Sequence, residues 1–269
     1  MHQLPPSFMP YKFIKFDISD SPAVASITLN RPDVLNSFNR PMAKEMQDAL
    51  DRCSEDKNIR AIYITGSGRS FCAGQDLEEA TDPETKTGEL VRETYNPIIR
   101  KIRNIEKPVV CAVNGIAAGA GANIAFACDI TLAAESASFI QSFANIGLIP
   151  DSAGTFFLPR LAGFQRASAM VMLAEKVKAQ QALEFGLIWK VFPDNQLQEE
   201  SFSIAQKLSS MPTKGIGLTK RMLNKGLCND LEAQLIMEEQ LQREAGNSYD
   251  YMEGVTAFLE KRKPVFKGE

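Results

Sequence analysis

The stretch KPVVCAVNGIAAGAGANIAFACDI, residues 107–130, determines the predicted fold. It begins with an unbroken apolar run at 108–113, which is typical of a strand buried on both faces. Small residues fill 114–122, a helix continues through 124–127, and a second apolar run follows at 129–134. Strand, small-residue turn, helix and strand in this order predict two parallel strands joined by a helix.

The same alternation extends toward both ends of the chain. Strands are predicted at 13–18, 24–29 and 59–65, helices at 40–53 and 90–105, and an acidic loop at 78–89. Because strands and helices alternate several times, the sequence predicts a layered α/β fold with largely parallel strands.

After about residue 180 the pattern becomes helical, and no strand is predicted there. Helical spacing of apolar residues recurs at 202–208, 212–223, 231–245 and 249–259. A length of 269 residues exceeds the ~150 of a common domain, so a core with an appendage is expected. We therefore divide the chain into a core at 1–200 and a C-terminal helical region at 201–269.

Composition excludes several classes of partner. Thirty Lys and Arg against thirty-three Asp and Glu give a net charge of -3, which provides no general attraction for nucleic acid. No segment approaches the ~18 uninterrupted apolar residues of a membrane span, and residues 1–13 lack the pattern of a secretory leader. We expect a cytoplasmic protein with neither a nucleic-acid nor a membrane partner.

The chain has a single histidine, His2, in a terminal segment expected to be mobile. Histidine-dependent nucleophile systems and most zinc or non-haem iron sites need an imidazole within the fold. We therefore expect neither a metal nor a permanently bound cofactor. The five cysteines form no CxxC pair, which indicates reduced thiols.

Two turns rich in small residues follow buried strands, SFCAGQDL at 70–77 and GAGAN at 119–123. The first N–H groups of a helix that follows such a turn are unpaired, so each turn is a candidate anion or oxyanion site. Small residues also serve close packing, and that alternative stays open. Neither a GxGxxG fingerprint nor a phosphate-binding loop is present, which disfavours nucleotide hydrolysis.

A third stretch, IGLIPDSAGT at 146–155, places one carboxylate, Asp151, between an apolar run and a helix predicted at 155–161. Asp151 could cap that helix by accepting backbone N–H bonds. It could instead transfer protons, because an acid among apolar groups is tuned toward neutrality. Both roles stay open from the local sequence.

These three stretches and the terminal FLEKRKPVF at 258–266, in this order, resemble the enoyl-CoA hydratase/isomerase (crotonase) family. The resemblance runs from about residue 13 to residue 267. It implies a crotonase-like spiral of ββα repeats and a coenzyme A thioester as substrate. It also implies trimerisation through the C-terminal helices, as a homotrimer or a dimer of trimers.

The resemblance also implies roles for individual residues. The backbone N–H groups of Gln75 and Ala120 would form an oxyanion hole for the thioester oxygen. The two glutamates of a hydratase are replaced by Asn123 and Phe143, and neither side chain can transfer a proton. Asn123 is then a candidate group for orienting a substrate or a water, and Asp151 stands where some isomerases and dehalogenases of the family carry their catalytic aspartate.

Coenzyme A contacts are implied by position at Val34, Leu35, Ala73 and Asp76, and at Lys261 from a neighbouring subunit. For the basic run at 261–263 the alternative is a solvated helix end, where cations are favoured in any case.

The sequence therefore predicts an acyl-CoA isomerase. IGLIPDSAGT and the segment 242–264 resemble the family's isomerases of phenylacetate degradation, which convert a ring epoxide of phenylacetyl-CoA into an oxepin thioester. One departure from that resemblance is Ala153, which stands where glycine is usual. A shift of a double bond from the 3,4 to the 2,3 position uses the same proton chemistry. The alternatives are an enoyl-CoA hydratase and a non-catalytic protein that binds coenzyme A thioesters.

Overall fold

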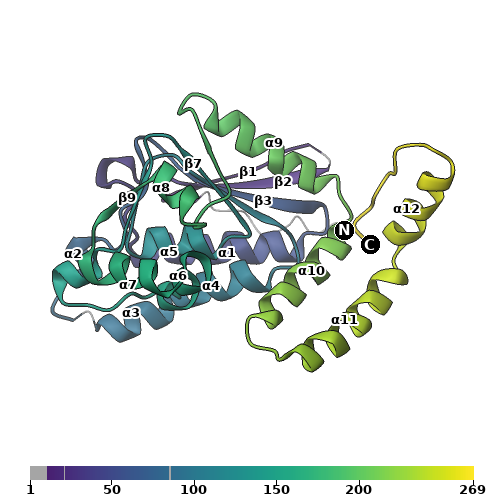
Figure 1. The fold of residues 1–269 in the computed structure, drawn as a ribbon. Helices are drawn as coiled ribbons and strands as arrows, with labels where there is room; N and C mark the ends of the chain where they lie inside the picture. The colour runs from purple at the N-terminus through teal and green to yellow at the C-terminus, as the bar shows by residue number, and fades with distance from the viewer. Residues whose placement is uncertain (1–10, 21, 85) are drawn as a thin grey trace.

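Two β-sheets carry the fold of this computed structural model, which describes residues 11–20, 22–84 and 86–269 (Figure 1). His2 lies outside the described residues. The larger sheet has the order β1 (Ile14–Ile18), β2 (Ala23–Leu29), β3 (Ile59–Gly66), β5 (Val109–Val113), β7 (Ile130–Ala134) and β10 (Lys190–Phe192). The smaller sheet has the order β4 (Ser70–Cys72), β6 (Ile116–Ala118), β8 (Ser138–Ile140) and β9 (Lys176–Lys178). Only β1 with β2 and β8 with β9 pair antiparallel among these strands.

The chain repeats one path through the two sheets. Each of β3, β5 and β7 leads to a short strand of the smaller sheet, β4, β6 and β8 respectively. Helical segments follow: α2 (Leu77–Ala80) after β4, α5 (Ala120–Ala127) after β6 and the 3-10 helix η2 (Ser142–Ile146) after β8. This repeated strand, strand, helix path confirms the predicted spiral of ββα units.

Helices cover both faces of the larger sheet. In Figure 1, α9 (Leu197–Ser209) lies on one face, while α1 (Arg40–Glu55), α4 (Tyr95–Asn104) and α5 lie on the other. As its spacing predicted, α1 buries Met42, Met46 and Leu50, and its N-cap Asn39 accepts the N–H of Met42 at 3.0 Å. Within the described residues, no helix has the length and apolar character required to cross a bilayer.

Three details differ from the prediction. The acidic loop at 78–89 is shorter than predicted, because Asp76 caps α2 at one end and α3 (Thr87–Glu93) begins at the other. The helix predicted at 90–105 is divided at Thr94 between α3 and α4. The prediction that no strand follows residue 180 was wrong, since β10 extends the larger sheet beside β7. Strands of three residues are too short to show a period in the sequence.

The other helical elements are η1 (Pro32–Val34), α6 (Gly154–Ala162), α7 (Phe164–Leu173) and α8 (Ala179–Glu184).

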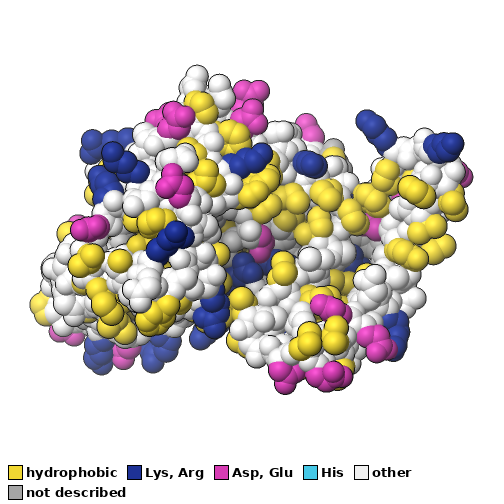
Figure 2. Space-filling model, viewed as in Figure 1, with side chains coloured by type: hydrophobic (Ala, Val, Ile, Leu, Met, Phe, Trp, Pro, Cys, Tyr) yellow, Lys and Arg dark blue, Asp and Glu magenta, His cyan; other side chains and the backbone are white. Residues whose placement is uncertain are grey.

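The last three helices, α10 (Thr213–Gly226), α11 (Leu231–Gly246) and α12 (Tyr249–Leu259), form an arm that projects from the body (Figure 1). Its surface carries large exposed apolar side chains: Leu231 is 75% exposed, Phe258 82% and Leu259 74%, and Figure 2 shows the hydrophobic side chains on it. Leu241, by contrast, is buried within the chain. The predicted boundary at residue 200 falls inside α9, and the division into two regions stays a prediction.

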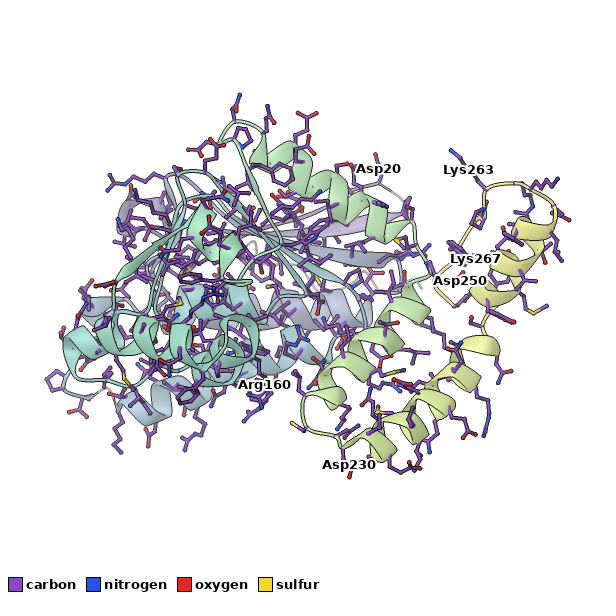
Figure 3. The ribbon with its side chains drawn as sticks, in the orientation of Figure 1. Asp20, Arg160, Asp230, Asp250, Lys263 and Lys267 are labelled. Atoms are coloured by element: carbon purple, nitrogen blue, oxygen red, sulfur yellow. The ribbon has the colours of Figure 1, made fainter. Side chains whose placement is uncertain are left out.

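The C-terminal segment ties this arm back to the body. The buried carboxylate of Asp250 accepts the N–H groups of Lys267 at 2.6 Å and Gly268 at 2.8 Å (Figure 3). Arg60 on β3 donates to the carbonyl oxygen of Phe266 at 2.6 Å and to Oγ1 of Thr213 at 2.8 Å. The arm is therefore held at both ends by side chains that are largely buried.

Candidate active site

Three short parallel strands bring the predicted site residues to one edge of the smaller sheet. β4, β6 and β8 are neighbours and run in the same direction, so their carboxyl ends lie side by side. Gln75 follows β4, Ala120 follows β6, and the chain from β8 leads through η2 to Asp151. The N–H of Gly119 donates to the carbonyl oxygen of Ile140 at 2.8 Å and links the ends of β6 and β8.

Gly74 brings the first turn against the second. Its φ of +95° belongs to the region that favours glycine. A Cβ atom at this position would lie 3.0 Å from the carbonyl oxygen of Ala118 and 3.8 Å from the backbone nitrogen of Ala120. The two turns that the sequence singled out are therefore in contact, and a side chain at Gly74 would push them apart.

Each turn includes a backbone donor without a hydrogen-bond partner among the described residues. Phe38 pairs with the first turn by donating to Gly74 and accepting from Asp76, which leaves the Gln75 N–H without an acceptor among the described residues. Ala120 is the first residue of α5, so its N–H has no partner within the helix. These two N–H groups are the pair that the resemblance assigned to an oxyanion hole.

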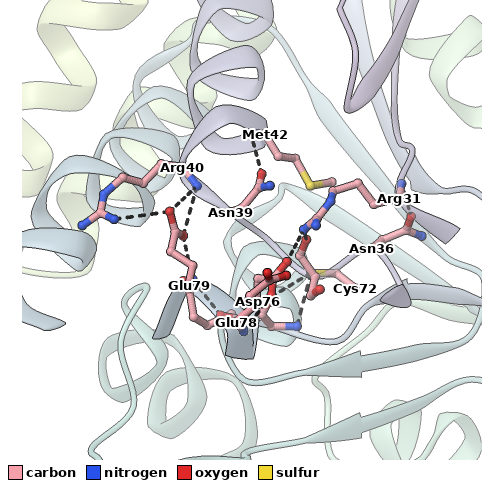
Figure 4. A network of polar contacts seen from close by, with 12 residues as sticks. Arg31, Asn36, Asn39, Arg40, Met42, Cys72, Asp76, Glu78 and Glu79 are labelled. Carbon is pink, nitrogen blue, oxygen red and sulfur yellow. Dashed lines mark hydrogen bonds and ion pairs between the residues drawn. The ribbon is translucent and has the colours of Figure 1, made fainter. Parts of the chain in front are cut away.

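A chain of polar contacts holds the side chain of Gln75. The hydroxyl of Tyr95 donates to Gln75 Oε1 at 2.5 Å, and Gln75 Nε2 donates to Glu79 Oε2 at 2.9 Å. Glu79 in turn accepts the backbone N–H of Arg40 and pairs with its guanidinium (Figure 4). Burial, followed by the neighbouring charges, raises the pKa of Tyr95 well above its usual value, so the hydroxyl keeps its proton and remains a donor.

Asp151 lies in a mostly buried position just before α6. Burial raises the pKa of its carboxyl to about 6, although the hydroxyl of Ser152, which donates to Oδ1 at 2.8 Å, favours the charged form. The N-cap of α6 is Ala153, and no N–H of the described helix donates to the Asp151 side chain. The interpretation of Asp151 as a helix cap is therefore wrong, and a carboxyl that titrates near neutrality is suited to proton transfer.

The turn after Asp151 has an unusual backbone. Ser152 has a φ of +49° and Ala153 a φ of +59°, so two successive residues with side chains adopt the left-handed conformation. Such residues cost about 1–3 kcal/mol each and are retained where the surroundings hold them. Ala153 therefore carries a methyl group in a conformation that glycine adopts freely.

The two positions of the hydratase glutamates have structural contacts instead. Asn123 is fully buried, and its Nδ2 donates to the backbone carbonyl of Asp151 at 2.9 Å. Phe143 is buried with its ring near Gly119, where a Cβ atom would lie 3.5 Å from Cζ. Asn123 is therefore directed at the Asp151 loop, whereas the sequence suggested a substrate or water as its partner.

The candidate coenzyme A contacts lie in different surroundings. Val34 is exposed at the end of η1, and the carbonyl of Leu35 accepts the N–H of Ala73 at 3.0 Å, which places these loops side by side. Asp76 is already engaged, because its carboxylate pairs with Arg31 at 2.7 Å and accepts the N–H of Glu78 (Figure 4). Lys261 is exposed just after α12, on the arm. Its contact with a neighbouring subunit stays a prediction.

The Cys72 thiol, which lies within the first turn, is not suited to nucleophilic chemistry. Burial raises the pKa of Cys72 to about 12, so this thiol keeps its proton. All five cysteines are free. Across the described ranges, no three His, Cys, Asp or Glu side chains gather in a way that could hold a metal ion.

Three residues of this site were not identified from the sequence: Tyr95, Gln141 and Ser152. Ser152 could have been found, since a hydroxyl next to a candidate catalytic acid is a plausible hydrogen-bond donor. Tyr95 and Gln141 meet their partners only through the tertiary fold, 20 and 18 residues away along the chain.

Known proteins share this architecture. The chain matches the profile of the enoyl-CoA hydratase/isomerase family over residues 19–269. It is 46% identical over 250 residues to the 1,2-epoxyphenylacetyl-CoA isomerase of Escherichia coli strain K12, which covers 91% of this chain and 95% of that protein. It is 45% identical over 260 residues to a Rhodobacter capsulatus protein named "Probable enoyl-CoA hydratase", with 97% and 100% covered. An enoyl-CoA hydratase structure from Bacillus anthracis has a TM-score of 0.91 at 35% identity, covering 96% of this chain and 100% of that chain. This likeness confirms the fold that the four motifs predicted.

Proposed function

The chain belongs to the enoyl-CoA hydratase/isomerase family, and from that premise we propose that it is an acyl-CoA isomerase in which Asp151 moves the proton. The substrates proposed are an epoxide of phenylacetyl-CoA, converted to the oxepin thioester, and 3,4-unsaturated acyl-CoA thioesters. Coenzyme A enters as part of the substrate, and no permanently bound cofactor takes part.

The double-bond shift needs one base and one stabilised oxygen. The carboxylate of Asp151 removes a proton from C2 of a 3-enoyl thioester, and the electron pair moves onto the thioester oxygen. The N–H groups of Gln75 and Ala120 stabilise this enolate, each at about 3–4 kcal/mol. Return of the proton to C4 gives the 2-enoyl thioester, an isomer of the substrate, and regenerates the Asp151 carboxylate. With the epoxide, Asp151 assists ring opening by the same proton transfer.

The observation that carries the proposal is the contrast between Asp151 and the two former glutamate positions. Asp151 is a partly buried carboxyl with a pKa of about 6, close to the value that suits a general base. Asn123 is bonded to protein groups at both ends of its amide, and Phe143 is an apolar ring. A base for proton transfer is thus present, while the pair that would activate water in a hydratase is not.

Binding and assembly are part of the same proposal. Val34, Leu35, Ala73 and Asp76 line the coenzyme A portion, with the Asp76 carboxylate held in place by Arg31. Lys261 reaches the phosphates of a ligand on a neighbouring subunit. The exposed apolar side chains of α11 and α12 support a trimer, alone or paired with a second trimer. The free cysteines agree with a cytoplasmic location.

Hydration is the second candidate function, and the name of the Rhodobacter capsulatus relative favours it. A hydratase built on this chain would need an acid other than the two missing glutamates. Asp151 is the candidate for that role as well, so the reaction products must decide between the two functions.

The deciding experiment incubates the protein separately with crotonyl-CoA, 3-hexenoyl-CoA and the phenylacetyl-CoA epoxide. Mass and ultraviolet absorbance of the products are then followed. We expect products of unchanged mass from the last two substrates, and new absorbance where the double bond becomes conjugated with the thioester. A gain of one water by crotonyl-CoA as the main reaction would favour a hydratase. No change in any substrate would leave a protein that only binds thioesters.

A further inference from the structure

We propose that Asn123 and Gln141 form an amide pair that positions Asp151, so that both are positioning residues for the reaction and neither contacts the substrate. The inference rests on the proposed function, because it assigns a role relative to the proton carrier. It replaces the earlier idea that Asn123 orients a substrate or a water.

The contacts of Asn123 lead to Asp151 and away from any ligand. Its Nδ2 donates to the backbone carbonyl oxygen of Asp151 at 2.9 Å, and its Oδ1 accepts from Gln141 Nε2 at 2.9 Å. The residue is fully buried, so both ends of the amide are occupied by protein groups. A Cβ atom on Gly154, at the start of α6, would lie only 2.4–2.8 Å from the Asn123 amide. The first turn of α6 therefore packs directly against this side chain.

Gln141 has no structural reason of its own to be an amide. It is fully buried at the end of β8, and its Oε1 has no hydrogen-bond partner among the described residues. A buried carbonyl oxygen without a donor carries a desolvation cost, which an apolar side chain of the same length would not have. What Gln141 does contribute is the Nε2 donor, which fixes the Asn123 amide with its own donor turned toward Asp151.

The backbone after Asp151 explains why such a restraint is needed. Ser152 and Ala153 both have left-handed φ angles, and a strained turn of this kind relaxes unless its surroundings hold it. Two donors hold it here at the Asp151 carbonyl: the Gly154 N–H at 2.8 Å and Asn123 Nδ2. Loss of the second would let the turn move and carry the Asp151 carboxylate with it.

Two single variants and one combination test this role. In Asn123→Ala we expect kcat to fall about tenfold or more, since a displacement of about 1 Å can cost up to ~10²-fold. The dissociation constant of an unreactive acyl-CoA analogue should stay within about twofold, because the Gln75 and Ala120 donors are untouched. Gln141→Met should lower kcat about threefold or more with little change in the unfolding midpoint, because removal of the unpartnered Gln141 Oε1 offsets the loss of the donor to Asn123 Oδ1. Asn123→Ala added to Asp151→Asn should cost no further activity, because both act through one group.

Asn224 provides a matched control on α10. Its Nδ2 donates to a backbone carbonyl, that of Arg103, at 2.8 Å, its Oδ1 accepts from the Arg103 guanidinium, and none of its hydrogen bonds among the described residues involves the Asp151 loop. Asn224→Ala should lower stability and leave kcat unchanged.

Wild-type kcat in both Asn123→Ala and Gln141→Met would overturn the inference. So would an equal fold-loss of activity when Asn123→Ala is introduced into the wild type and into Asp151→Asn. A fall in the affinity for the analogue that accounts for the whole loss of activity in Asn123→Ala would overturn it as well. If Asn123→Ala does not fold, Gln141→Met alone decides by the same criteria. Wild-type turnover of Asp151→Asn would instead remove the proposed function, so the two failures are distinguishable.

Discussion

The hydroxyl of Tyr95 lies 2.5 Å from Oε1 of Gln75, the residue whose backbone N–H is a free donor at the strand ends. Tyr95 belongs to α4 and Gln75 to the turn after β4, so this contact joins a helix of the core to the candidate oxyanion hole. Because the tyrosine is buried and keeps its proton, the donor is available throughout the neutral pH range.

Tyr95→Phe removes this hydroxyl and keeps the ring. The Gln75 side chain then loses a donor at a partly buried oxygen, which should cost about 1–3 kcal/mol of unfolding free energy. We expect kcat to fall several-fold, by less than the ~10²-fold that follows loss of a whole oxyanion donor. Denaturant unfolding and steady-state kinetics on 3-hexenoyl-CoA measure the two effects. A variant with unchanged kcat would show that the Gln75 side chain does not influence its N–H.

The pH dependence of kcat/KM follows from the raised pKa of Asp151. A base must be deprotonated to act, so activity should be low in acid and rise with pH through about 6 to a plateau. In Ser152→Ala the carboxylate loses a donor that favours its charged form, so the midpoint should move to higher pH. Rate profiles of the wild type and this variant test the assignment. A plateau that already begins near the ordinary aspartate pKa, about 4, would contradict it.

Ala153→Gly tests the strained turn directly. Glycine adopts a φ near +59° without the steric cost of a Cβ atom, which is about 1–2 kcal/mol, but it gains freedom in the unfolded chain. We expect a net stabilisation of about 0.5–1 kcal/mol, visible as a rise in the thermal midpoint. A lower midpoint would mean that the methyl group of Ala153 packs well enough to outweigh its backbone conformation.

Assembly should depend on the arm. With Leu231, Phe258 and Leu259 each more than 70% exposed in the single chain, burial between subunits should stabilise an oligomer. Light scattering is expected to give three or six chains. The variant Phe258→Glu should shift this size downward, whereas a stable, active monomer of the wild type would refute the trimer.

Much of the architecture could be predicted because long elements show a period. The strand β5 is a continuous apolar run, β3 is apolar apart from Arg60 and Thr65, and α1 repeats Met42, Met46 and Leu50 at helical spacing. The three-residue strands β4, β6 and β8 carry no such pattern, although their parallel pairing is what brings the site together. The order of the motifs could suggest the site, but not the sheet that assembles it.

The same limit applies to the site residues. The sequence could single out Asp151 but could not decide between cap and base, because that depends on where α6 begins and how deeply the carboxyl is buried. Asn123 could be identified by its position, but its hydrogen bonds with Gln141 and with the Asp151 carbonyl could not. Its bond with Gln141 exists only because β6 and β8 pair, which places α5 next to the end of β8.

A stability control must accompany any substitution of Asp151. The raised pKa means that the folded protein binds more protons than the unfolded chain between about pH 4 and 6. Stability therefore falls as pH rises through this window, by up to about 3 kcal/mol for a shift of about two units. Asp151→Asn has no such titration, so at about pH 8 it should be at least as stable as the wild type. A loss of activity in this variant then cannot be attributed to unfolding.

The most direct test of the central claim is the turnover number of Asp151→Asn on 3-hexenoyl-CoA at about pH 8. Asparagine keeps the shape of the side chain but cannot accept the proton, so we expect kcat to fall by at least ~10²-fold, with the affinity for an unreactive thioester largely retained. A variant that isomerises at the wild-type rate would contradict the assignment of Asp151 as the proton carrier.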